Sequence, residues 1–344
     1  MRVLVTGHDG YIGAVMVPML RDAGHEVVGL DAYLFEGCVF GHTGTRDVAS
    51  LRCDIRDVRA VDLEGFDAII HLAALSNDPL GDLNPECTYE INHRAAVRLA
   101  RLAKGAGVSR FLFSSSCSLY GVSDGAGLLC EDAAFHPVTP YGTSKIRVEE
   151  DVSQLADRNF SPTFLRNATA YGVSPKLRGD LVVNNLVGFA YTTGEILISS
   201  DGTPWRPLVH VEDISRAFLA VLQAPRTLIH NEAFNVGRSE ENYQIRDIAE
   251  MVKDVVPSAT VTYAAGGGPD PRCYRVDCEK LLTTLPGFAP QWTVRQGIEQ
   301  LYAAYQANRI SVDEFLGTKY LRIKHIRMLL GEGRLDGTLR WQPI

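Results

Sequence analysis

The sequence predicts an α/β protein: a doubly wound parallel sheet with a smaller, mostly C-terminal domain that binds substrate. Three observations favour this fold class. Short apolar runs alternate with amphipathic stretches in the first half, a glycine-rich turn follows the first run, and the pattern loosens after residue 172. Continuous apolar strands that alternate with helices imply a parallel sheet covered on both faces.

Four apolar runs predict the first strands: RVLVT (2–6), EVVGLD (26–31), DAIIHL (67–72) and RFLFSS (110–115). The clearest helix is expected over 89–107, because apolar residues recur there at helical spacing before Gly105 and Gly107 end it. A helix over about 181–193 and a short strand EILI (195–198) follow later.

The domain division follows from these patterns. We expect a nucleotide-binding Rossmann-type domain over 1–172, to which 207–238 returns, because the strand and helix style resumes in that segment. The ranges 173–206 and 239–344 are then assigned to the substrate domain.

Composition narrows the class of protein. With 344 residues, 46% of them hydrophobic, the chain can bury a large core in one or two globular domains. No apolar run reaches the roughly 18 residues that span a bilayer, and MRVLVTG reads as a strand rather than a signal peptide. We therefore expect a cytoplasmic protein with no membrane partner.

Charge and cysteine content exclude two further classes. The net charge of −7 argues against nucleic acid as a partner, although a few placed arginines could hold a small anion. Seven cysteines without a C-x-x-C pair suggest neither a disulfide framework nor a zinc site, so no metal is predicted.

The turn TGHDGYIG predicts a dinucleotide site. Gly7 permits the tight turn, Gly10 lets the backbone approach a pyrophosphate, and Gly13 lets the helix pack close to the strand. The second strand ends in Asp31, whose carboxylate would accept both ribose hydroxyls and repel a 2′-phosphate, which favours NAD over NADP. Five further residues are expected beside the adenine, ribose or pyrophosphate: Asp54, Ile55, Ala73, Ala74 and Ser76.

PYGTSK places Tyr141 and Lys145 one helical turn apart, so they project from the same face. An ammonium group beside the phenol, together with the positive nicotinamide ring, would lower the tyrosine pKa from about 10 toward working pH. Such a tyrosine is a candidate general base; the alternative is an ordinary surface helix pair.

In this order and spacing, TGHDGYIG, Asp31, HLAALS, SSSCSLYG and YGTSK resemble the extended short-chain dehydrogenase/reductase family, and within it the nucleotide-sugar epimerases and dehydratases. The resemblance covers about residues 1–305. It implies an NAD cofactor, a nucleoside-diphosphate sugar substrate, and a homodimer paired through the helices containing Ala95–Leu102 and Tyr141–Val152. Further cofactor contacts that it implies are Tyr11, Ile12, Leu72, Asn92, Ser114, Tyr141 and Lys145.

The family's spacing to the tyrosine assigns the catalytic hydroxyl to Ser116, which would share the sugar hydroxyl's proton with Tyr141. Related dehydratases carry an Asp-Glu pair immediately after this residue, and related decarboxylases carry the glutamate. Here Cys117 and Ser118 follow, expected near the substrate. The Cys117 thiol could pack in the core or act as a weak acid or base.

The resemblance also implies a sugar-nucleotide side. Asn167 would lie beside the sugar, Asn185 at the diphosphate, and Tyr274 in the sugar pocket, while Arg206 and Arg272 would grip the diphosphate and nucleoside. For each arginine the alternative is a surface salt bridge.

The expected activity is NAD-dependent 4-epimerisation by transient oxidation at C4, rotation of the 4-keto sugar and hydride return. The alternatives are a decarboxylase, a 4,6-dehydratase, a 3,5-epimerase or a 4-keto-reductase on the same scaffold, and more remotely a non-catalytic NAD-binding regulator. The segment 311–344 could cover the active-site cleft, mediate association or dock on the core.

Overall fold

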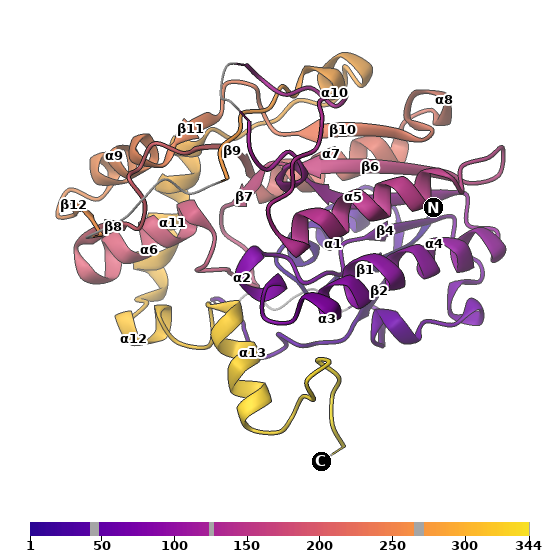
Figure 1. Cartoon of the computed structure of the whole chain (residues 1–344), viewed down its shortest axis with the longest axis horizontal. Coiled ribbons are helices and arrows are strands. Elements are labelled where there is room, and N and C mark those ends of the chain that lie inside the picture. Colours follow the sequence, from indigo (N-terminus) through magenta and orange to yellow (C-terminus); the bar gives the residue numbers. More distant parts are fainter. Residues whose placement is uncertain (42–47, 124–126, 265–271, 344) are drawn as a thin grey trace.

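The structure is a computed structural model that describes residues 1–41, 48–123, 127–264 and 272–343. A seven-stranded parallel sheet runs through it in the order β10-β6-β5-β4-β1-β2-β3 (Figure 1). Its strands are β1 Arg2–Thr6, β2 Glu26–Asp31, β3 Ser50–Arg52, β4 Ala68–His71, β5 Arg110–Ser116, β6 Ser161–Asn167 and β10 Glu232–Val236. The predicted α/β fold with a doubly wound parallel sheet is confirmed.

Helices cover both faces of this sheet. Because side chains alternate along a strand, Val3 and Val5 pack with α1 (Gly13–Asp22) and α7 (Val211–Gln223) on one face. Leu4 packs on the opposite face, where α4 (Ala95–Gly105) and α5 (Pro140–Ser153) contribute to the core. The strand order reverses between β1 and β4, and ligands bind at the carboxyl edge of such a reversal.

The predicted helix over 89–107 begins earlier in the structure. Asn84 caps α3 (Pro85–Tyr89) by accepting a hydrogen bond from Cys87 N, and the chain continues through a π-helical turn, Glu90–Arg94, into α4. Helical spacing of apolar residues cannot show such a widened turn, which shifts the side chains after it by one position.

Two smaller sheets and a second helical layer form the remainder. Antiparallel β11 (Asn242–Gln244) and parallel β7 (Thr169–Tyr171) flank β9 (Trp205–His210), and β8 (Glu195–Ile198) pairs with β12 (Thr260–Tyr263). The helices of this part are α6 Val182–Thr193, α9 Ile245–Val255 and α11 Val294–Asn308, whose apolar residues form a separate core. Short helices elsewhere are α2 Asp78–Gly81, α8 Arg226–Ile229, α10 Glu279–Thr284, α12 Val312–Phe315 and α13 Arg322–Gly331.

The segment 207–238 contributes to both parts of the molecule. Its first residues lie in β9, outside the main sheet, whereas α7 packs on that sheet and β10 is its edge strand. The exact division into domains stays a prediction. Over the described ranges, no helix is both long and apolar enough to cross a membrane.

Candidate active site

A cavity of about 870 Å³ opens at the carboxyl ends of the main sheet's strands and extends toward the second part of the molecule. All but two of the predicted site residues line it: Gly7, Gly10, Tyr11, Ile12, Gly13, Asp31, Asp54, Ile55, Leu72, Ala73, Ala74, Ser76, Ser114, Ser116, Ser118, Tyr141, Lys145, Asn167, Asn185, Arg206, Arg272 and Tyr274. The topology therefore brings residues from distant parts of the chain to one site.

The glycine turn has the shape of a dinucleotide cradle. Gly7 has φ +73°, and a Cβ there would lie 2.8 Å from Ala73 N, so the turn packs directly against the loop after β4. A Cβ on Gly13 would lie 2.5 Å from Gly7 O, which keeps the start of α1 close to the turn. The backbone from Gly10 to Gly13 consequently borders the cavity, where the helix N-terminus favours a phosphate.

Asp31 is held at the end of β2 by two backbone donors. Tyr33 N donates to its Oδ1 at 2.7 Å, and Asp9 N donates to its Oδ2 at 3.1 Å. The carboxylate is thus fixed at the cavity wall, which suits a ribose and opposes a 2′-phosphate.

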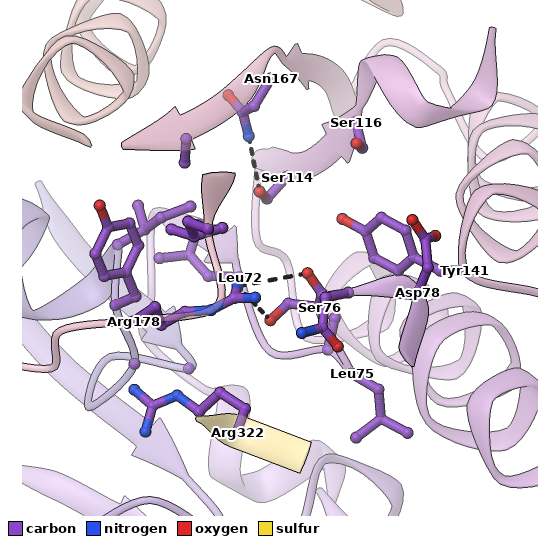
Figure 2. Close-up of a pocket in the computed structure, with 18 of the residues that line it drawn as sticks. Leu72, Leu75, Ser76, Asp78, Ser114, Ser116, Tyr141, Asn167, Arg178 and Arg322 are labelled. Carbon is purple, nitrogen blue, oxygen red and sulfur yellow. Dashed lines mark hydrogen bonds between the residues drawn. The ribbon is translucent and has the colours of Figure 1, made fainter. Parts of the chain in front are cut away.

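Tyr141, Lys145 and Ser116 meet at the catalytic end of the cavity. Thr139 caps α5 by accepting a hydrogen bond from Gly142 N at 3.2 Å, which places Tyr141 in the first helical turn. Lys145, one turn later, is 3% exposed and donates from Nζ to Ser114 O at 2.7 Å. In Figure 2 the hydroxyls of Tyr141 and Ser116 face the same space.

The electrostatics of this group differ from the sequence-based expectation. Burial raises the pKa of Tyr141 to about 12, and a hydrogen bond with Ser116 offsets only part of this rise. Burial also lowers the pKa of Lys145 to about 7, against the opposing charge of Glu149. In the described part of the chain, burial therefore outweighs the groups that would lower the phenol pKa.

Cys117 and Asn92 do not lie where we expected them, because neither is among the described residues that line the cavity. A 3-10 turn after β5 turns Cys117 inward, where it is 0% exposed and donates from Sγ to Arg166 O at 3.1 Å. Burial strongly raises the pKa of this thiol, so acid-base chemistry at Cys117 is not favoured. Asn92 instead braces the loop after β4: its Oδ1 accepts from Leu75 N at 2.8 Å and its Nδ2 donates to Leu75 O at 3.0 Å.

Ser118 and Tyr274 line the cavity beside Ser116. Ser118 N donates to Ser116 Oγ at 3.1 Å, which fixes the Ser116 hydroxyl at the strand end. Tyr274 is 4% exposed and hydrogen-bonded to Ser118, so its ring forms a rigid part of the wall.

The predicted substrate residues come from three segments. Asn167 Nδ2 donates to Ser114 Oγ at 3.0 Å (Figure 2), while its buried Oδ1 has no hydrogen-bond partner in the described part of the chain. Arg206 Nη1 donates to Arg272 O, which ties the two arginines together. Asn185 donates from Nδ2 to Gly179 O at 2.8 Å.

Six charged residues of the cavity were missed by the sequence analysis: Asp9, Asp78, Asp82, Arg178, Asp180 and Arg322. Asp78 accepts from Thr139 Oγ1 at 2.7 Å and pairs with Arg272. Arg178 pairs with Asp180 at 2.8 Å and donates to Ser76 Oγ at 3.1 Å (Figure 2). The sequence feature that could have indicated such residues is a short charged segment such as LRGD (177–180). Ordinary surface loops carry segments of the same kind.

Comparisons with known proteins show the family of this chain. A family model described as the NAD dependent epimerase/dehydratase family matches residues 3–237. UDP-glucose 4-epimerase of Corynebacterium glutamicum is 27% identical over 328 residues, 88% of this chain and 95% of that protein. UDP-glucuronic acid decarboxylase 1 of Arabidopsis thaliana is 26% identical over 336 residues, which cover 92% of this chain and 72% of that protein. The structure of MoeE5 in complex with UDP-glucuronic acid and NAD is 27% identical with a TM-score of 0.78, covering 89% of this chain and 99% of its own.

Proposed function

The chain belongs to the NAD-dependent epimerase/dehydratase family and uses NAD, and on this premise we propose that it is a nucleotide-sugar 4-epimerase. One observation carries the choice of reaction. Tyr141, Lys145 and Ser116 meet in the cavity, while the next residue, Cys117, is turned into the core and Ser118 is neutral. A 4-epimerase needs a base at one hydroxyl, whereas elimination of water needs a further acid and base.

Tyr141 is the proposed base for the sugar C4 hydroxyl. Ser116 would hydrogen-bond the same hydroxyl and pass its proton to the phenolate, since it already interacts with the Tyr141 phenol. Lys145 stabilises the phenolate from the next helical turn, and its hydrogen bond to Ser114 O fixes its position. NAD, when bound, supplies reversible oxidation at C4.

We further propose that the two tied arginines hold the diphosphate while the sugar turns over. Guanidinium groups match phosphate oxygens in geometry, and Arg206 is 7% exposed, so its bonds to an anion would be shielded from water. The pairing of Arg272 with Asp78 connects this anchor to Thr139, the cap of the helix that carries Tyr141. Asn167, which lines the cavity, is proposed to lie beside the sugar.

Other reactions on the same scaffold are less well supported. The position of Cys117 and the neutral Ser118 argue against decarboxylation, dehydration and a thiol-dependent 3,5-epimerase. Asp31 argues against a reductase that uses NADPH. Tyr141 and Lys145 together argue against a regulator that binds NAD without turnover.

A panel of nucleotide sugars tests the proposal. The purified protein is incubated, without added cofactor, with UDP-, dTDP-, GDP- and CDP-linked hexoses and hexuronates, and the products are separated by chromatography with mass detection. We expect a C4 isomer of unchanged mass from at least one substrate. A product that has lost water or CO2, or no product from any member of the panel, would show that the proposal is wrong.

The predicted homodimer is also a proposal. The faces of α4 and α5 that would pair expose Arg98, Arg101, Arg147 and Glu150, so we expect an interface with many polar contacts. Light scattering coupled to size-exclusion chromatography should give twice the 37.7 kDa chain mass. A mass of one chain at micromolar concentration would contradict it.

A further inference from the structure

The C-terminal segment lies outside the sequence resemblance, yet it borders the cavity. Phe315 and Tyr320 pack into the core of the second part of the molecule, and Leu329 packs into the core beside the main sheet. Figure 1 shows α13 and the chain after it below the sheet, in yellow. Two apolar residues of this segment, Ile323 and Leu339, line the cavity.

The segment ends in a short hairpin, Leu335–Trp341. Leu335 and Trp341 pair as an antiparallel bridge, and Asp336 N donates to Arg340 O at 3.0 Å. The Asp336 carboxylate closes the loop, because its Oδ1 accepts from Thr338 N at 2.8 Å and from Arg340 N at 3.0 Å. The shape of the hairpin is thus fixed by hydrogen bonds between its own residues.

The hairpin is bonded to the short turn that follows β3. Arg340 forms a two-pronged ion pair with Asp57, at 2.5 Å from Nη1 and 3.1 Å from Nη2. On the other side of the loop, Arg56 donates from Nη1 to Thr338 O at 2.8 Å. Leu339 lies between these two attached residues, so its backbone is held beside the turn.

This end of the cavity is where the adenosine of NAD is expected. A dinucleotide that lies over the glycine turn and meets Asp31 with its ribose places its adenine beyond that carboxylate. Asp54 and Ile55, the residues predicted beside the adenine, belong to the region that the hairpin contacts. The hairpin also reaches the loop directly after Asp31, where Trp341 donates from Nε1 to Ala32 O at 2.7 Å.

Leu339 gives this end of the cavity an apolar wall. Its side chain is 4% exposed and belongs to the same apolar cluster as Ile55 and Ile91, which also line the cavity. Ile323 of α13 packs against this cluster. The backbone of Leu339 has φ +60°, a strained conformation for leucine that persists only where surrounding contacts hold it. Apolar walls of this kind suit a flat base better than a charged phosphate.

From this geometry we propose that the hairpin Leu335–Trp341 closes the adenosine end of the NAD site, with the Leu339 side chain as a contact of the adenine ring. Covering the face of the base removes apolar surface from water, which stabilises bound NAD. Because the hairpin is bonded to the loops on both sides of this end, it should slow the release of NAD. The proposal rests on NAD binding and does not depend on the reaction proposed above.

The test compares NAD release from Leu339→Gly with release from Leu335→Ala. Glycine adopts φ +60° without strain, so the first variant loses the side chain while the hairpin can keep its shape. Leu335 is 3% exposed and packs in the same core but lies outside the described cavity lining, so it is the matched control. Each protein is loaded with radiolabelled NAD, and the loss of label is followed after addition of excess unlabelled NAD.

We expect Leu339→Gly to release NAD about 10- to 100-fold faster than wild type, since a leucine side chain no longer covers the base. Leu335→Ala should release NAD at nearly the wild-type rate even if its melting temperature falls. The melting temperature with saturating NAD verifies folding. Leu339→Asn carries the test if the glycine variant does not fold, because asparagine also tolerates this backbone conformation.

Competition separates the two ends of the cofactor. ADP and nicotinamide mononucleotide are each tested for their ability to block uptake of labelled NAD. In Leu339→Gly we expect ADP to compete about tenfold less well than in wild type, and nicotinamide mononucleotide to compete equally well.

Three results would overturn the proposal. They are a wild-type release rate in a folded Leu339 variant, an equal weakening of both competitors, and release from Leu335→Ala as fast as from Leu339→Gly. Failure of the nucleotide-sugar panel would leave these measurements unaffected, so the two proposals can fail separately.

Discussion

The ammonium nitrogen of Lys145 lies 5.5 Å from the centroid of the Tyr141 ring and 4.6 Å from that of Phe113. The ammonium group donates a hydrogen bond to Ser114 O at 2.7 Å. The lysine is thus fixed beside the phenol in a buried setting, where a charge acts more strongly than in water. This arrangement suits a lysine that supports a phenolate, and it makes both residues sensitive to substitution.

Replacing Tyr141 by phenylalanine should remove the base while keeping the ring. We expect kcat to fall about 10²- to 10⁴-fold, because general base catalysis contributes that much, while NAD still copurifies. Turnover assays and the NAD released on denaturation provide the two readouts. Tyr302→Phe, in α11 and outside the described cavity lining, is the matched control. Retained activity in Tyr141→Phe would exclude this residue as the base.

Lys145→Met should stabilise the fold in a pH-dependent way. Burial lowers the pKa of Lys145 from 10.5 to about 7, so the folded state disfavours the charged form. The free-energy cost of burying the charged lysine is fully present below pH 7 and disappears as the pH rises from 7 to 10.5. The gain in melting temperature should therefore be largest at or below pH 7 and shrink toward pH 10.5. The exposed Lys324→Met should show no such trend; a gain that grows with pH would be inconsistent with a buried, charged Lys145.

Ser116 and Cys117 are adjacent in sequence but should behave differently when each is replaced by alanine. Loss of the Ser116 hydroxyl should lower kcat about 10- to 100-fold, the value of a hydrogen bond to a charged group. Loss of the Cys117 thiol should leave kcat near wild type and reduce the free energy of unfolding by about 1 kcal/mol, typical of a buried substitution. Steady-state kinetics and urea unfolding measure the two effects. A large kcat loss in Cys117→Ala would show that its thiol participates in the reaction.

Asp31→Asn should relax the choice of cofactor. The carboxylate repels a 2′-phosphate, so its removal should shift the ratio of NAD to NADP affinity by about tenfold or more toward NADP. Competition of each dinucleotide against labelled NAD gives this ratio. Asp132→Asn, an exposed residue with the same charge change, is the control. An unchanged ratio in Asp31→Asn would remove Asp31 as the source of NAD preference.

The parts of the site that the sequence predicted are those encoded in short contiguous motifs. Gly7, Gly10 and Gly13 form one turn, Asp31 ends the strand that follows, and Tyr141 and Lys145 share one helical face, so local geometry alone relates them. Cys117 shows the limit of this reasoning. A turn of three residues after β5 decides whether its side chain faces the cavity or the core, and residue order does not encode that rotation.

Long-range packing explains the remaining differences. Arg322 lies far along the chain from the predicted cofactor residues, and the docking of α13 beside Phe35 brings it to the cavity lining. Asn92 has a position on a helix that suits a cofactor contact, yet the π-helical turn directs its amide to Leu75. Neither outcome could be predicted from periodicity, because both depend on the contacts between elements.

The most direct test of the proposed reaction follows deuterium at C4. A nucleotide sugar found to turn over in the panel is prepared with deuterium at C4 and incubated with the protein in unlabelled water, and the product is analysed by NMR and mass spectrometry. Transient oxidation at C4 predicts a C4 epimer that keeps its deuterium at C4 and its mass. Loss of the label from C4, solvent hydrogen incorporated at C3 or C5, or a product lighter by water or CO2 would contradict the account.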